Sequence, residues 1–303
     1  MSTIGFVGLG AMGSRIASRL LDAGNDVYGT NRTKSRARPL IEHGLRWRDT
    51  PREVAAVVDV IFSMVTDDEA LEAVISGSDG ILAGLRPGQI YVDMSTVSPR
   101  ASRTVAEQVE SLGAQMLDAP VSGSIPQAES GTLAIMVGGD EQAFAKVEPL
   151  LREVGQAVTY IGENGQGLVL KLAINISLAV QTLAFSEGLL LAERDGVDPR
   201  VAADVMSATP IGSPMLKARI PLLLDLPDQA WFDIAMMQKD IRLALEAART
   251  VDLPLPSAAA ADQMLTRASE LSYEHRDIAA LHEVLSRTPA GEALASTADS
   301  PRV

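Results

Sequence analysis

Residues 4–13 read IGFVGLGAMG, an apolar run that ends in three glycines with the spacing G-x-G-x-x-G. The run predicts a buried strand and residues 14–23 predict a helix, so the glycines fall at a strand-to-helix turn. There the first glycine permits a tight bend, the second lets a pyrophosphate approach the backbone, and the third lets helix and strand pack closely. A glycine turn without a ligand is the alternative. The predicted cofactor-binding residues are Gly8, Leu9, Gly10, Ala11, Met12 and Gly13.

The loop after the second predicted strand lacks an acidic residue. An NAD enzyme usually places Asp or Glu about twenty residues past the glycines, where it binds the ribose 2′-hydroxyl. Residues 27–41 contain neither, and instead Asn31, Arg32 and Thr33 can donate hydrogen bonds to a 2′-phosphate. Three more basic residues follow by position 38. This pattern predicts NADP, with NAD less favoured, and the alternative is a solvated basic start of a helix.

Short apolar runs alternate with helical patterns as far as residue 161, which is typical of βαβ units on a mostly parallel sheet. Strands are predicted at residues 3–7, 26–29, 60–64, 90–93, 115–118, 134–137 and 158–161. Helices alone are predicted beyond them, at residues 167–194, 199–208, 231–250, 256–272 and 278–286. We therefore predict an α/β protein with an N-terminal Rossmann-type doubly wound parallel sheet over residues 1–162 and an all-α domain over 163–287. A tail at 288–303 is expected to lack fixed structure.

Net charge and residue composition disfavour several classes of function. The net charge of −13 disfavours binding to nucleic acid or to anionic membranes. No cysteine occurs, and the three histidines lack the spacing of metal ligands, so thiolate and metal catalysis are not expected. The longest apolar stretch, residues 172–185, is too short to span a bilayer, and no export signal is visible, which favours a cytoplasmic protein. The apolar helix at 168–191 predicts a homodimer or larger homo-oligomer.

Lys171 stands in an apolar part of the predicted long helix, and Asn175 follows one turn later on the same face. Burial would lower the pKa of this lysine and let it exchange a proton near neutral pH, while Asn175 could orient it or hold a substrate oxygen. A lysine that extends along the helix into solvent is the alternative. The residue pattern leaves both interpretations open.

Four separated blocks occur in a fixed order: IGFVGLGAMG at residues 4–13, DAPVSGS at 118–124, GQG at 165–167 ahead of Lys171 and Asn175, and QKD at 238–240. Together they resemble the β-hydroxyacid dehydrogenases, typified by 3-hydroxyisobutyrate dehydrogenase, over nearly the whole chain. The resemblance implies that Lys171 is the catalytic acid/base and that Asn175 contacts a small carboxylate substrate.

Further site residues are implied in the same way. Ser122 and Gly123 match donors to the substrate carboxylate, and Thr96 matches a residue beside the substrate and the nicotinamide. Met64 and Val65 match contacts with the cofactor. For these positions helix capping or simple packing is the alternative.

Two positions refine this resemblance. The lysine that matches Lys239 reaches the substrate and the cofactor in the family, and an ion pair with Asp240 is the alternative. Ser124 stands where many relatives have a glycine. A serine at this position resembles the branch of the family that reduces semialdehydes such as glyoxylate or succinic semialdehyde. The implied reaction is NADP-dependent hydride transfer to or from a small β-hydroxy carboxylate or semialdehyde. The alternatives are an imine reductase, which usually carries Asp or Tyr in place of Lys171, and a catalytically silent NADP-binding module.

Overall fold

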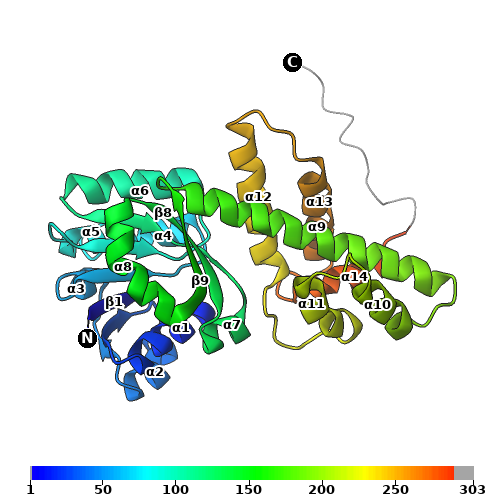
Figure 1. Ribbon diagram of the computed structural model, residues 1–303, viewed down its shortest axis with the longest axis horizontal. Helices are drawn as coiled ribbons and strands as arrows, with labels where there is room; N and C mark the ends of the chain where they lie inside the picture. Colours follow the sequence, from blue (N-terminus) through cyan, green and yellow to red (C-terminus); the bar gives the residue numbers. More distant parts are fainter. Residues whose placement is uncertain (1, 290–303) are drawn as a thin grey trace. The chain divides into compact units, whose positions relative to one another are not determined.

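The computed structural model describes residues 2–289, which form two compact units that divide after Ala173. In the first unit a nine-stranded sheet has the order β3-β2-β1-β4-β5-β6-β8-β7, with β9 paired to β8 (Figure 1). Its strands are β1 (Thr3–Val7), β2 (Asp26–Thr30), β3 (Arg46–Trp47), β4 (Val60–Ser63), β5 (Ile90–Asp93), β6 (Gln115–Asp118), β7 (Val121–Ser122), β8 (Leu133–Gly139) and β9 (Gly155–Gly162). Pairing is parallel from β3 to β6 and between β8 and β9, and β8 is antiparallel to β6 and β7.

Helices cover both faces of this sheet, as a doubly wound fold requires. They are α1 (Ala11–Asp22), α2 (Arg38–Glu42), α3 (Pro51–Ala55), α4 (Asp68–Ile75), α5 (Ile81–Gly84), α6 (Pro99–Ser111), α7 (Ile125–Ser130) and α8 (Glu141–Val154), with a 3-10 turn at Lys34–Ala37. One apolar cluster joins α1 and α8 to Phe6 and Val92, and a second joins α3, α4 and α6 to Ile61 and Tyr91. Neighbouring strand residues therefore point into opposite cores. The predicted fold class is confirmed.

Side chains cap the helices that follow β4, β5 and β8. Asp67, Ser98 and Asp140 each accept a hydrogen bond from the backbone N–H three residues later. Such caps stabilise the first turn of a helix, where the N–H groups lack partners within the helix. They fix where each helix begins after its strand.

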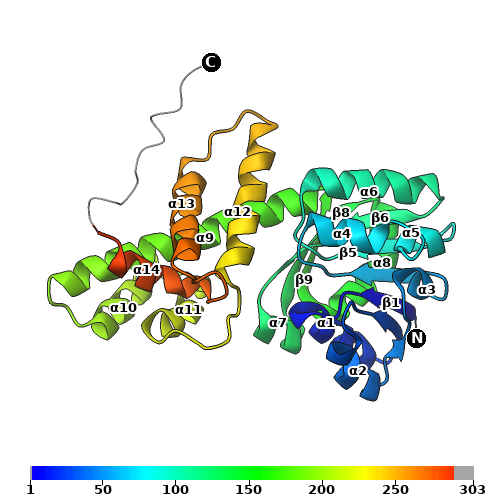
Figure 2. The same ribbon diagram turned by 180° about the vertical axis from the view of Figure 1, so that it is seen from behind.

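The helix α9 (Gln166–Arg194) continues from the first unit into the second and is the long green helix of Figures 1 and 2. By length and composition alone it could span a membrane, with a mean hydropathy of 1.8 in its most apolar window. Its first turns belong to the first unit, since Leu168 packs in the second apolar cluster. The predicted domain boundary after residue 162 stays a prediction.

The second unit is helical. It comprises the rest of α9, α10 (Pro199–Ala208), α11 (Pro214–Leu224), α12 (Ile234–Arg249), α13 (Pro256–Glu270), a 3-10 turn at Ile278–Ala280 and α14 (Leu281–Arg287). The helices α12 and α13 lie side by side in both views. The helix predicted from residue 231 begins only at Ile234, because Asp233 caps it. Most of the predicted tail, residues 290–303, lies outside the described residues.

A buried ion pair joins two segments of the second unit. Arg219 on α11 donates from Nη1 to Oδ1 of Asp277 over 2.9 Å, and their side chains are 8% and 0% exposed. Asp277 also accepts backbone N–H groups of Trp231, Phe232 and Ala279. Burial lowers the pKa of Arg219, and the Asp277 carboxylate opposes that shift. The carboxylate is thus a structural anchor for three backbone N–H groups and for the guanidinium of α11.

Candidate active site

The three glycines of the first turn have different surroundings. Gly8 has a φ of +93°, and a Cβ there would lie 2.3 Å from the carbonyl oxygen of Met64. A Cβ on Gly13 would lie 2.1 Å from the Gly8 oxygen, so this glycine lets α1 pack against β1. A Cβ on Gly10 would meet nothing within 4 Å. The turn therefore leaves space for a ligand where the backbone is most accessible, which fits a bound pyrophosphate.

The start of α1 suits an anion. Its N-cap residue is Gly10, which offers no side-chain cap, and its first turn carries no acid. The free N–H groups of a first turn and the helix dipole attract negative charge. Leu9 is already engaged, because its N–H donates to Oδ1 of Asn31 over 3.1 Å, and Asn31 donates in turn to the Thr33 oxygen. Asn31 thus connects the glycine turn to the loop after β2.

The basic residues of that loop differ in their contacts. Lys34 lies 3.7 Å from the Asp49 carboxylate and above the Trp47 ring. Arg38 pairs with Glu42 on its own helix. Within residues 2–289, by contrast, exposed Arg32 forms no ion pair or hydrogen bond. Arg36 is likewise exposed and has no such side-chain contact among the described residues, but Arg32 stands closer to β2, two residues after its end at Thr30.

A buried hydrogen-bond chain connects the ends of β4 and β5. Ser63 and Ser95 each donate from Oγ to Oδ1 of Asp93 over 2.6 Å. Ser95 Oγ also accepts the N–H of Val65 over 2.9 Å, and the Tyr91 hydroxyl lies 2.6 Å from Ser63 Oγ. Burial, followed by the Asp93 charge, raises the pKa of Tyr91 well above its usual value. The chain holds Val65 beside the loop that carries the half-buried Thr96.

Asp118, at the end of β6, anchors the start of α9. Its Oδ1 accepts the N–H of Gly165 over 2.7 Å, and its Oδ2 accepts the N–H of Leu168 over 2.9 Å. The residue is fully buried, and burial raises the pKa of its carboxyl although both hydrogen bonds oppose the shift. A Cβ on Gly138 or Gly167 would lie 2.5 or 2.8 Å from these carboxylate oxygens. The glycines therefore make room for the anchor.

The predicted substrate loop follows β7. Ser122 is half-buried at the end of that strand, and Gly123 has a φ of +130°, a left-handed conformation that favours glycine. A Cβ on Gly123 would lie 2.8 Å from Leu133. Ser124 is the N-cap residue of α7, and its N–H donates to Oε1 of Gln127 over 2.9 Å. Ser124 therefore shapes the turn on which Ser122 stands.

Lys171 is turned inward on α9. It is only 9% exposed, whereas Val169 and Leu170 beside it are 45% and 39% exposed. This is the reverse of the exposure expected for a lysine that extends along its helix into solvent. The helix therefore buries an amine and exposes two aliphatic side chains.

In the second unit Asn175 and Lys239 meet at one carboxylate. Asn175 is 1% exposed and donates from Nδ2 to Oδ2 of Asp240 over 2.5 Å. Lys239 Nζ lies 2.9 Å from Oδ1 of Asp240, which is the ion pair considered from the sequence. The buried Asp240 thus orients two predicted site residues.

Two family models match most of the chain. Residues 3–162 match the NAD binding domain of 6-phosphogluconate dehydrogenase, and residues 165–285 match the NAD-binding domain of NADP-dependent 3-hydroxyisobutyrate dehydrogenase. Glyoxylate/succinic semialdehyde reductase 2 of Arabidopsis thaliana, a chloroplastic protein, is 37% identical over 96% of this chain and 81% of its own length. The 2-hydroxy-3-oxopropionate reductase of Escherichia coli is 36% identical over 93% of this chain and 96% of its own.

A solved structure adds to this. Mycobacterium tuberculosis 3-hydroxyisobutyrate dehydrogenase, in a structure with L-serine, has a TM-score of 0.84 and 30% identity over 95% of this chain and all of its own. The chain belongs to the β-hydroxyacid dehydrogenase family. It is accordingly an NAD(P)-dependent oxidoreductase that acts on CH–OH groups. Both the resemblance found in the sequence and the enzyme class are confirmed.

Three carboxylates of this β-hydroxyacid dehydrogenase were not predicted as site residues: Asp93, Asp118 and Asp240. Each is at most 1% exposed. Asp118 and Asp240 stand in the DAPVSGS and QKD blocks, which was the available signal, whereas Asp93 ends an ordinary apolar strand. Each has at least one partner distant in sequence: Ser63 for Asp93, Leu168 for Asp118 and Asn175 for Asp240.

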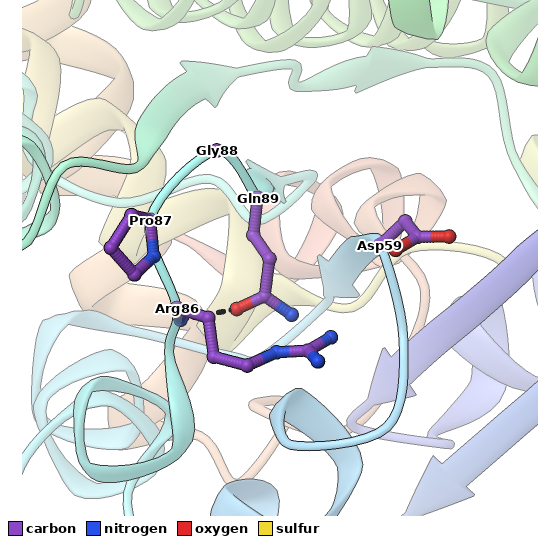
Figure 3. Close-up of a pocket in the computed structure, with 5 residues that line it drawn as sticks. All are labelled: Asp59, Arg86, Pro87, Gly88 and Gln89. Carbon is purple, nitrogen blue, oxygen red and sulfur yellow. Dashed lines mark hydrogen bonds between the residues drawn. The ribbon is translucent and has the colours of Figure 1, made fainter.

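A hollow of about 300 Å³ lies elsewhere in the dehydrogenase, at the amino ends of β4 and β5 (Figure 3). It is lined by Asp59, Arg86, Pro87, Gly88 and Gln89. Gln89 donates to the carbonyl oxygens of Ala55 and Val58 and accepts the Arg86 N–H, so its amide is fully engaged. Ligands of parallel sheets bind at the carboxyl edge, which is the opposite one. Among residues 2–289 no group of three or more His, Cys, Asp or Glu could hold a metal ion.

Proposed function

We propose that this enzyme transfers a hydride reversibly between NADP(H) and a small β-hydroxy carboxylate or semialdehyde, with Lys171 as general acid/base. The observation that carries the proposal is the burial of Lys171 on a helix whose first turn is fixed by Asp118. An amine placed inside a protein can move a proton only toward groups held beside it. The names of the relatives, which include two reductases of small oxo acids or semialdehydes, support this substrate class.

In this mechanism Lys171 removes the hydroxyl proton when the substrate is oxidised and returns a proton to the alkoxide oxygen when the carbonyl is reduced. The nicotinamide, when bound, accepts or supplies the hydride. Ser122 and Gly123 bind the substrate carboxylate, and Asn175, oriented by Asp240, holds the substrate. Such positioning supplies a large part of the rate in enzymes.

The preference for NADP rests on Arg32 together with the acid-free loop around Asn31 and Thr33. Met64, Val65, Thr96 and Lys239 complete the proposed cofactor contacts. Replacement Arg32→Ala should raise the KM for NADPH about tenfold, because a charge-assisted hydrogen bond to phosphate is lost, and leave the KM for NADH unchanged. Arg38→Ala is the matched control, since Arg38 already pairs with Glu42. Equal effects on both cofactors would remove the basis for the preference.

We further propose a homodimer or larger homo-oligomer formed through the helical unit, and a cytoplasmic location. Leu191, Val201 and Val205 are 74%, 56% and 61% exposed, which is a large apolar area for one unit to leave in water. Light scattering at micromolar concentration tests the assembly. A monomeric mass would contradict it.

An assay panel tests the function itself. NADPH oxidation is followed with glyoxylate and succinic semialdehyde, with cyclic imines, and with NADH in place of NADPH. Turnover of the semialdehydes with NADPH is the expected result. Turnover of the imines alone would identify an imine reductase, and NADPH binding without any turnover would favour a silent cofactor-binding module.

A further inference from the structure

We propose that Asp93 and Asp118 are positioning residues that divide the work of the site: Asp93 holds the cofactor loops, and Asp118 holds the helix of Lys171. This inference rests on the proposed function. Neither carboxylate needs to touch the reacting atoms, because each acts through groups that it hydrogen-bonds. The experiment below separates the two roles.

The two carboxylates form a pair in the centre of the sheet. Asp93 and Asp118 end the adjacent strands β5 and β6, are opposite each other in the parallel register, and are both fully buried. The N–H of Ala119 donates to the Asp93 carbonyl oxygen over 2.7 Å and continues the ladder by one residue. The charge of Asp93 adds to the burial that raises the pKa of Asp118. Two desolvated acids side by side are costly for stability, which indicates that they serve another purpose.

Asp93 acts on the cofactor side. Its Oδ1 accepts both Ser63 Oγ on β4 and Ser95 Oγ after β5. Because Ser95 donates to Asp93, its lone pair is directed to the Val65 N–H. The position of Val65, and of Thr96 next to Ser95, therefore depends on this single acceptor.

Asp118 acts on the lysine side through both oxygens. They accept the N–H groups of Gly165 and Leu168, before and within the first turn of α9. Each residue of an α-helix advances the direction of its side chain by a fixed angle, so fixing Leu168 fixes the direction of Lys171 three residues later. A rotation of the helix about its axis would move the Lys171 amine by several times the shift of the backbone.

A change to asparagine should affect the two carboxylates differently, and the test uses this difference. Asp93→Asn keeps a carbonyl oxygen that can accept from both serines, whereas Asp93→Ala removes it. Asp118→Asn keeps one acceptor and places an amide NH₂ against the second backbone N–H, so α9 must shift. Wild type, these three variants and Asp140→Ala are compared by NADPH fluorescence titration, by kcat, by the pH profile of kcat, and by thermal unfolding. Asp140→Ala removes the cap of α8 in the same unit and is the matched control for lost capping.

The expected results differ between the two arms. Asp93→Ala weakens NADPH binding about tenfold, the size expected when buried hydroxyl donors lose their acceptor, and Asp93→Asn restores binding to within about threefold. Asp118→Asn lowers kcat about tenfold and shifts the pH profile of kcat, with NADPH affinity unchanged. Asp140→Ala lowers the unfolding temperature and alters neither NADPH affinity nor kcat.

A second variant and the NADPH titration separate a folding defect or a wrong substrate from a loss of positioning. If Asp93→Ala does not fold, Ser95→Ala takes its place, because it removes only the hydroxyl that accepts from Val65. If wild type turns over none of the substrates, the proposed function fails, while NADPH titration still tests the Asp93 arm. A lower unfolding temperature with unchanged affinity, kcat and pH profile in both variants would show that the pair is only structural.

Discussion

Asp118 in the first unit and Asp277 in the second are both fully buried, yet their surroundings differ. Asp277 receives the Arg219 guanidinium and three backbone N–H groups. Asp118 accepts the N–H groups of Gly165 and Leu168, and burial raises its pKa. Asp277 is compensated by a buried positive charge, whereas Asp118 is held where it costs stability and orients a helix. The difference shows that burial of an acid does not by itself indicate its purpose.

The largest effect is expected on stability, when Asp277 is removed. Asp277→Ala leaves the Arg219 charge buried without its partner and should lower the free energy of unfolding by about 3–5 kcal/mol. The two tryptophans lie in different units, so a Trp47→Phe background leaves Trp231 as a fluorescence probe of the second unit. Urea unfolding in that background measures the loss. The matched control is Glu42→Ala, which breaks the exposed Arg38 pair and should leave the midpoint unchanged.

A smaller effect is expected on the Asp118 side. Gly167→Ala places a methyl group 2.5 Å from the Met136 carbonyl oxygen and 2.8 Å from Oδ2 of Asp118, which forces the start of α9 outward. Displacement of Lys171 by about 1 Å should lower kcat about a hundredfold. Gly188→Ala, farther along the same helix with only the flexible Met206 side chain near its Cβ, is the matched comparison. Normal turnover by Gly167→Ala would show that the position of α9 is not critical.

The smallest effect concerns pH. Because the pKa of Asp118 is raised above the ordinary 3.8, the folded protein keeps a proton that the unfolded chain has already released. The free energy of unfolding therefore falls as pH rises from 3.8 through the raised pKa, by at most about 1.4 kcal/mol per pH unit. Asp118→Asn lacks this contribution. Urea unfolding of both proteins is measured between about pH 3.5 and 7, which covers this window. The free energy of unfolding of the wild type should fall more steeply with pH than that of the variant, and parallel pH curves would contradict this.

The sequence predicts the glycine turn and the motif residues of the site better than the groups that hold them in place. The glycine turn could be recognised because each glycine role depends on residues within one strand and helix, as Gly8 and Gly13 show. The two-residue strand β7 was not predicted because so short a run carries no alternation. The helix α11 was missed because Pro221 interrupts a segment with no apolar stripe.

The carboxylate contacts could not be predicted for a different reason. Asp118 finds its partners 47 and 50 residues later, and Arg219 finds Asp277 after 58. Such pairs depend on how the sheet and helices assemble, which local patterns do not determine. Family resemblance assigned Lys171 and Asn175, but it did not indicate which groups hold them.

The most direct measurement is the turnover of Lys171→Ala with NADPH and succinic semialdehyde, set beside its affinity for NADPH. A positioned acid/base contributes on the order of 10² to 10⁴ in rate, so kcat should fall by about a thousandfold while the Kd for NADPH stays within about twofold of wild type. Lys146→Ala, on the outer helix α8, serves as the control lysine. A Lys171→Ala enzyme with wild-type kcat would contradict the assignment of proton transfer to this residue.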